Sequence, residues 1–163
     1  MLSVRKILVP IDLSPTGTRV LEQAQVFATR FSATIDLLYV WTPPALQAPE
    51  TMLTGVGAAE QPLLEWLRSS AQEQLSKFAS QAESAGIAIA QSYCDLGDPT
   101  TIILERAGSG GYDLLVLGTH GRTGLSHALM GSVAEKVVRR APCAVLTVRT
   151  AGAGASASAS ASD

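Results

Sequence analysis

The sequence lacks several features that would place it directly in a broad functional class. No apolar run approaches the roughly 20 residues that a membrane-spanning helix requires, so we expect no membrane insertion. Basic residues are not in excess, with 12 Lys and Arg against 14 Asp and Glu, and this balance argues against nucleic acid as the main partner. The opening residues do not resemble a signal peptide, so we expect a cytoplasmic protein.

Signatures of metal, disulfide and common nucleotide sites are also missing. The two cysteines, Cys94 and Cys143, lie far apart and form no CxxC pair, which fits a reducing compartment. The sequence contains no HExxH, which excludes that type of zinc site, and no GxxxxGK[ST], which excludes an ordinary P-loop. No GxGxxG follows the first apolar run, so a nicotinamide dinucleotide is not expected.

What the sequence does contain is a set of short apolar runs that alternate with helical patterns. The run Lys6–Ile11 is rich in branched residues and does not alternate with polar ones, as is typical of a strand buried on both faces. Further strands are expected at Thr34–Trp41, 87–93, 113–118 and Ala144–Val148. Helices are expected after Ser14, from about residue 62 to Gly86, from Asp98, and from Ser132 to about Arg140, where Ser132 and Glu135 would form a capping box.

This alternation predicts an α/β fold, a doubly wound sheet of five parallel strands with helices on both faces. We expect one domain over residues 1–149. Residues 42–61 are predicted to form a long loop, and the Ala, Gly and Ser repeat of residues 150–163 is predicted to be a disordered tail.

Ligands bind doubly wound parallel sheets at the carboxyl ends of strands. Asp12 and Gly118 follow the first and fourth strands, and they would line one crevice if those strands are neighbours.

A glycine-rich segment carries the strongest indication of chemistry. Gly118 and Gly121 are followed by Gly131 and Ser132 at the start of a predicted helix. Glycines allow a phosphate to approach the backbone closely, and a helix N-terminus favours anions. Arg122 could reach a terminal phosphate. On spacing alone, an equally good interpretation is that the glycines only turn the chain and Ser132 only caps a helix.

The residues 118–133, GTHGRTGLSHALMGSV, resemble the G-x2-G-x9-G-[S/T] motif of ATP-binding universal stress proteins. The opening KILVPIDLS resembles the first strand of that family, which ends in an aspartate, and residues 141–148 resemble its fifth strand. The resemblance covers about residues 4–148. It implies an ATP site in which adenine packs at the end of the second strand, with main-chain bonds at Val40, and Asp12 approaches the ribose or a bound metal.

The resemblance also implies that the ribose and phosphates are held by Gly118, Gly121, Gly131 and Ser132. His120 is either a phosphate contact or a loop residue that points to solvent. The cofactor would be ATP, with Mg²⁺ or Mn²⁺ on its phosphates and Asp12 as the nearest metal ligand. The expected nucleotide-binding residues are Pro10, Asp12, Val40, Leu117, Gly118, His120, Gly121, Arg122, Gly131, Ser132 and Val133.

Three functions follow from these expectations. The first is an ATP-binding regulatory protein of the stress response with slow or no hydrolysis, since Asp12 is the one obvious carboxylate near the site and no catalytic residue can be assigned. The second is an enzyme of the same α/β class, either a weak ATP hydrolase or an adenylate-transferring protein. The third is a scaffold without a ligand. The resemblance also implies a homodimer through the strand Ala144–Val148, and a further protein partner cannot be identified.

Overall fold

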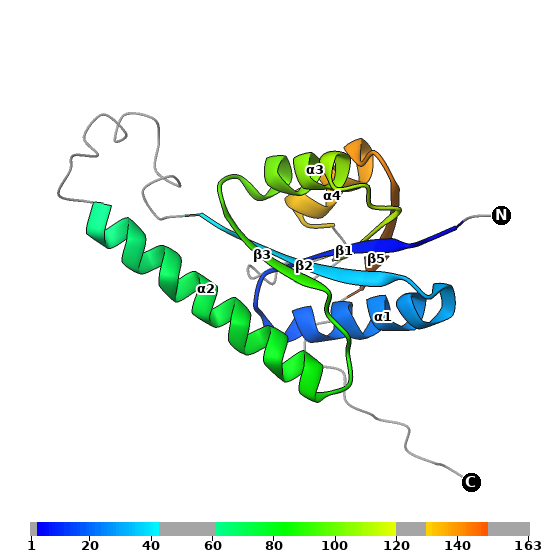
Figure 1. Cartoon of the computed structure of the whole chain (residues 1–163). Coiled ribbons are helices and arrows are strands. Elements are labelled where there is room, and N and C mark those ends of the chain that lie inside the picture. Colours follow the sequence, from blue (N-terminus) through cyan, green and yellow to red (C-terminus); the bar gives the residue numbers. More distant parts are fainter. Residues whose placement is uncertain (1–2, 43–60, 120–129, 150–163) are drawn as a thin grey trace, which may run out of the picture.

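The computed structural model describes residues 3–42, 61–119 and 130–149. Strands and helices alternate along the chain, as the sequence predicts (Figure 1). The elements are β1 (Lys6–Ile11), α1 (Pro15–Phe31), β2 (Thr34–Trp41), α2 (Gln61–Ser84), β3 (Gln91–Leu96), α3 (Pro99–Ser109), β4 (Leu114–Gly118), α4 (Ser132–Arg140) and β5 (Ala144–Val148). No helix among the described residues is long and apolar enough to span a membrane.

All five strands are parallel and lie in the order β3-β2-β1-β4-β5. The central strand β1 pairs with β2 from Lys6 opposite Thr34 to Ile11 opposite Tyr39, and it pairs with β4 on its other side. The strand order reverses between β1 and β4, which is where an open α/β sheet forms a ligand crevice. The predicted fold class is therefore confirmed, and the first and fourth strands are neighbours, as a common crevice for Asp12 and Gly118 requires.

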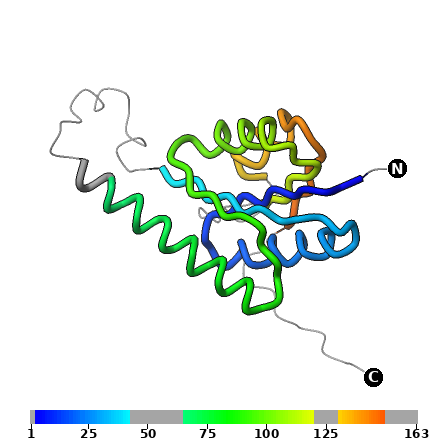
Figure 2. The backbone as a smooth tube through the Cα atoms, viewed as in Figure 1, coloured from blue at the N-terminus to red at the C-terminus, as the bar shows by residue number. Residues whose placement is uncertain are grey.

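Helices cover both faces of the sheet. Figures 1 and 2 show α1 and α2 on one face and α3 and α4 on the other. Each face has its own apolar cluster: Val9 and Leu37 pack on the α1 and α2 side, whereas Leu8 and Leu38 pack with Ile103 on the other. Successive strand residues therefore enter different cores, which explains why β1 and β2 read as continuous apolar runs rather than alternating ones.

The third strand begins later than the sequence indicates. The prediction of a strand over residues 87–93 is wrong in its bounds, because β3 spans Gln91–Leu96. Ile87 is buried against the core of the α1 and α2 side, but it belongs to the connection that follows α2. Gly86 adopts φ +87 just after α2, as expected of a glycine that ends a helix. The apolar run thus fills the core before the strand starts, and β3 itself is a partly exposed edge strand.

The capping box predicted at α4 is also wrong. Gly131 occupies the N-cap position, and Ser132 is already the first helical residue. Ser132 therefore cannot place its hydroxyl where an N-cap side chain would bond. The carboxylate of Glu135 instead lies 3.4 Å from Nε of Arg139, one turn further along the helix. Within the part of the chain that the structure describes, no side chain caps α4.

Some expectations lie outside the described residues. They are the site residues His120, Gly121 and Arg122, most of the loop predicted over 42–61, and the tail of residues 150–163.

Candidate functional site

A cavity of about 540 Å³ opens at the carboxyl ends of the strands. Its volume lies within the range of roughly 300–1,000 Å³ that is usual for small-molecule sites. The ends of β1, β2 and β4 line it together with residues from all four helices. Eight of the eleven expected binding residues line this cavity: Pro10, Asp12, Val40, Leu117, Gly118, Gly131, Ser132 and Val133.

Asp12 lies directly after β1 and is held in one orientation by the turn into α1. Its Oδ1 accepts hydrogen bonds from the backbone N–H of Ser14 at 3.0 Å and from the Ser14 hydroxyl at 2.5 Å. Ser14 is the N-cap residue of α1, as predicted, but its hydroxyl is directed to Asp12 and to Thr16 instead of capping the helix. The turn uses a left-handed backbone at Leu13, with φ 59.

The second carboxylate oxygen of Asp12 has a different environment. Oδ2 is buried and has no hydrogen-bond partner among the described residues. A buried polar atom without a partner is uncommon in native proteins, and it costs about 1–3 kcal/mol. Because Asp12 lines the cavity, this oxygen is the natural acceptor for a hydroxyl group or a cation carried by a ligand.

Val40 offers backbone groups to the same cavity. The pairing of β1 with β2 ends at Ile11 opposite Tyr39, after which the chain turns at Leu13 into α1. The carbonyl of Trp41 accepts a hydrogen bond from Gly97, on the β3 side. Since consecutive residues of a strand direct their backbone groups to opposite neighbours, those of Val40 face the β1 side, beyond the last paired residue of β1. They can bond the edge of a flat heterocycle.

The N-terminus of α4 forms the other side of the cavity. Its first N–H groups, those of Ser132, Val133 and Ala134, have no intrahelical acceptor because a helix leaves its first turn unsatisfied. The amide of Gly131 is already used, since it donates to the carbonyl of Thr119 at 2.7 Å. The backbone of Gly131, with φ −59 and ψ 149, is open to any residue, so a glycine here provides space and not a special conformation.

The neighbouring helix α3 shows how the same position is used when a side chain fills it. Asp98 is the N-cap, and its Oδ1 accepts hydrogen bonds from the N–H of Thr101 at 2.9 Å and the Thr101 hydroxyl at 2.8 Å. The backbone bond from Thr101 is the main reason why the pKa of Asp98 lies below its ordinary value. Helix α3 thus carries its own anion, whereas α4 presents a glycine there and leaves the place open to an external anion.

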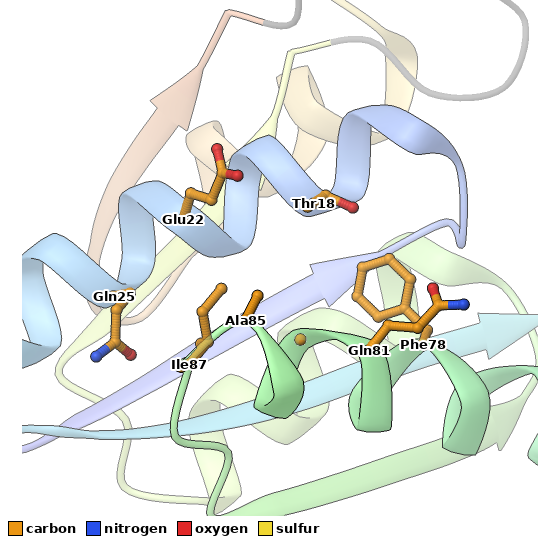
Figure 3. A pocket seen from close by; sticks show the side chains of 9 residues that line it. Thr18, Glu22, Gln25, Phe78, Gln81, Ala85 and Ile87 are labelled. Atoms are coloured by element: carbon orange, nitrogen blue, oxygen red, sulfur yellow. The ribbon is translucent and has the colours of Figure 1, made fainter.

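A second cavity, of about 350 Å³, lies between α1 and the end of α2. Figure 3 shows side chains from both helices around it, among them Gln25 and Phe78. No strand end and no helix N-terminus contributes to its described lining, so it offers none of the backbone donors found in the larger cavity. We therefore take the cavity at the carboxyl ends of the strands as the candidate site.

Sequence reasoning missed part of this arrangement. It did not find that Ser14 orients Asp12, because a Ser-Pro pair signals a helix start and nothing more. It also gave Trp41 no place in the site, and the side chain is only 8% exposed. However, Trp41 lines the cavity, and its indole nitrogen is buried without a hydrogen-bond partner in the described structure.

Comparison with known proteins agrees with the fold and with the sequence pattern. Residues 3–149 match the model of the universal stress protein family. The chain is 35% identical over 145 residues to universal stress protein MJ0531 of Methanocaldococcus jannaschii, an alignment that covers 89% of this chain and 82% of the relative. The structure of MJ0577 from the same organism superposes with a TM-score of 0.73 at 27% identity, covering 93% of this chain and 99% of that one. A universal stress protein solved in complex with cAMP shares the fold, with a TM-score of 0.63 at 23% identity over 91% of this chain and 99% of that one. The chain belongs to the universal stress protein family.

Proposed function

We propose that this universal stress protein binds ATP in the cavity at the carboxyl ends of its strands and acts as a nucleotide-dependent regulatory protein, with slow or no hydrolysis. The observation that carries the proposal is the meeting, in one cavity, of an unpartnered oxygen of Asp12 with the uncapped N-terminus of α4. The first suits a ligand hydroxyl and the second suits a phosphate.

Each part of the nucleotide has a matching group. The backbone of Val40 would bond the adenine edge, while Pro10 and Leu117 pack near it. Oδ2 of Asp12 would accept a ribose hydroxyl, and Ser132 with the first amides of α4 would hold phosphate oxygens. Gly118 and Gly131 leave room beside them. We include His120, Gly121 and Arg122 in the site on the strength of the sequence motif.

A divalent cation fits this site only in combination with the nucleotide. The described residues contain no group of three side chains suited to hold a metal ion. Among the described residues that line the cavity, Asp12 supplies the one carboxylate. Mg²⁺ commonly takes one or two carboxylates together with substrate phosphates and water, so Asp12 would be its protein ligand here. The cation would reduce the negative charge of the phosphates.

The identity of the bound nucleotide is the first thing to test. A protein with this fold has been solved with cAMP, which is a property of that protein and makes cAMP a necessary competitor in the experiment. Protein purified without added nucleotide would be denatured, and the released small molecules identified by mass spectrometry. Calorimetric titration with ATP, ADP, AMP, cAMP and GTP would then rank the ligands. We expect ATP to bind most tightly, and the absence of binding by all five would overturn the proposal.

A pair of serine variants tests the placement of the phosphates. Ser132→Ala removes one donor to a charged group, which contributes about 1.5–3 kcal/mol, so the Kd for ATP should rise roughly ten- to a hundredfold. The stability without ligand should hardly change, because Ser132 is exposed and does not cap the helix. Ser109→Ala, near the other end of α3, is the matched control and should bind like the wild type. An unchanged affinity for ATP in Ser132→Ala would show that the phosphates do not bind at the N-terminus of α4.

We also propose that the protein forms a homodimer through β5, which is an edge of the sheet. An apolar edge strand invites pairing, and a two-fold contact between copies would satisfy both edges at once. A further protein partner stays unidentified.

Residues 1–149 would form the whole binding unit, so a chain that ends at Thr150 should keep its melting temperature and its affinity for ATP.

A further inference from the structure

We propose that Trp41 is a specificity-determining residue of the nucleotide site, and that its indole N–H donates a hydrogen bond to an acceptor nitrogen of the ligand's base. This inference rests on the proposed function, since it assumes that the cavity at the carboxyl ends of the strands holds a nucleotide. It adds a recognition element that the glycine motif does not contain.

The first argument is the state of the indole nitrogen. The side chain of Trp41 is 8% exposed, and its Nε1 is out of contact with solvent and without a hydrogen-bond partner among the described residues. Buried tryptophan N–H groups usually find a partner. The other tryptophan of the chain, Trp66 on α2, is 63% exposed and can donate to water. Trp41 therefore carries a donor with no acceptor among the described residues, and a molecule bound in the cavity can supply one.

The second argument is the position of Trp41. It is the last residue of β2, directly after Val40, and both residues line the cavity. Ser132 and the start of α4 line the cavity from another element, which follows β4 in the chain. Because the phosphates are assigned to α4 and the base to Val40, Trp41 follows the residue assigned to the base, and its side chain lies on the α1 and α2 side of the sheet.

The third argument is that the backbone around Trp41 is held firmly. The N–H of Gly97 donates to the carbonyl of Trp41 at 3.2 Å, and the hydroxyl of Thr42 donates to the carbonyl of Gly97 at 2.8 Å. Gly97 has φ +151, a conformation that favours glycine, and it leads straight into the Asp98 cap of α3. The start of the indole side chain is thus fixed by the junction of β2, β3 and α3.

These features define the chemistry of the ligand. A donor-only group such as an indole N–H selects a lone pair in the plane of a heterocycle, and a purine offers such lone pairs at its ring nitrogens. Oδ2 of Asp12 is the complementary acceptor in the same cavity and selects a ligand hydroxyl. Because the indole nitrogen is sealed from solvent, the base reaches it as the cavity wall adjusts on binding.

The test combines a protein variant with ligand analogues. Trp41→Phe keeps an aromatic ring and removes the N–H, and Trp66→Phe makes the same change at an exposed position. A neutral hydrogen bond contributes about 0.5–1.5 kcal/mol, which corresponds to a two- to tenfold rise in the Kd for ATP. We expect this rise in Trp41→Phe and no change in Trp66→Phe, by calorimetric titration of variants whose circular dichroism matches the wild type.

Deaza analogues of ATP separate the hydrogen bond from simple packing. ATP with carbon in place of nitrogen 1, 3 or 7 loses one ring acceptor each time. One of the three should bind the wild type two- to tenfold more weakly than ATP, yet bind Trp41→Phe no more weakly than ATP does, because the partner is already gone. If every analogue loses the same factor in both proteins, Trp41 only fills space and the inference is overturned.

A fluorescence measurement covers the case in which Trp41→Phe fails to fold. The chain has two tryptophans, so Trp66→Phe leaves Trp41 as the only tryptophan reporter. Its emission should shift to longer wavelength or be quenched when ATP binds, and unchanged emission at saturating ATP would overturn the inference. A wild-type protein that binds no nucleotide at all would instead overturn the proposed function itself.

Discussion

The amide of Gly131 donates a hydrogen bond of 2.7 Å to the carbonyl oxygen of Thr119, and this contact joins the start of α4 to the end of β4. It places both ends of the glycine-rich segment beside the same cavity. The bond also means that the amide of Gly131 is not available to a ligand. The amides that remain for an anion are those of the first turn of α4.

The first prediction concerns the absence of a side chain at Gly131. Its φ of −59 suits alanine, so Gly131→Ala should not strain the backbone and should keep or slightly raise the stability measured by urea unfolding. The added methyl group would occupy space next to the phosphates. We expect at least a tenfold loss of affinity for ATP by calorimetric titration, and Gly131→Val should abolish measurable binding. A folded Gly131→Val that binds ATP as the wild type does would show that the phosphates lie elsewhere.

The second prediction concerns the edge strand β5. The carbonyl of Val148 accepts a hydrogen bond from the Thr119 amide at 3.0 Å, so the backbone of Val148 faces β4 and that of Thr147 faces the open edge. Thr147→Pro removes one N–H from the open edge only, where proline is tolerated. We expect light scattering to give a dimer for the wild type and a monomer for Thr147→Pro.

Thr147→Val is the matched control for this experiment, because it alters the same side chain but keeps the backbone N–H. It should remain dimeric. A monomeric wild type at micromolar concentration would contradict the proposed dimer, and a folded, dimeric Thr147→Pro would show that the two copies meet at another surface.

Much of this fold could be predicted because each signal was local. The runs of β1 and β2 are apolar at successive residues because both faces of the sheet are covered, and that pattern is visible in the sequence. The bounds of β3 were predicted wrongly because this edge strand is partly exposed and lacks a continuous apolar run. Ile87, which precedes the strand, is buried and has the apolar character expected of a strand residue. The apolar residue at position 87 therefore reflects packing in the core and not the start of the strand.

The candidate site was predictable only in part. Asp12 and Gly118 could be placed together because the ends of neighbouring parallel strands meet at one edge of the sheet. The role of Ser14 depends on a left-handed turn at Leu13, and the unpartnered nitrogen of Trp41 depends on what surrounds it in space. Neither the backbone conformation of a single turn residue nor the surroundings of a buried side chain can be read from spacing or composition.

The third prediction uses the helix cap at Asp98. Hydrogen bonding to Thr101 lowers the pKa of Asp98 in the folded state. Its stabilisation is therefore complete above the unfolded-state pKa, near 3.9, and is lost as the pH falls through the lower folded-state value. Asp98→Ala should cost about 1 kcal/mol in urea unfolding at pH 7.

The difference between wild type and Asp98→Ala should shrink as the solution is acidified below pH 4. Asp98→Asn supplies the control, since asparagine caps a helix about as well as aspartate and does not titrate. It should resemble the wild type at pH 7 and show no such acid dependence. A wild-type advantage over Asp98→Ala that stays constant to low pH would contradict this account of the cap.

The last prediction is that ATP hydrolysis is slow. Rapid phosphoryl transfer needs a group that positions the attacking water and cationic groups that stabilise the transferred phosphoryl group. Asp12 is the one carboxylate among the described residues that line the cavity. One oxygen of Asp12 is already engaged by Ser14, which leaves the other for the ribose or the cation.

We expect a turnover far below the roughly 10 s⁻¹ typical of enzymes, measured by phosphate release with Mg²⁺ and with Mn²⁺. Asp12→Ala should bind ATP more weakly and show no greater turnover. A metal-dependent rate near that typical value, constant through purification and lost in Asp12→Ala, would instead make the protein an ATP hydrolase.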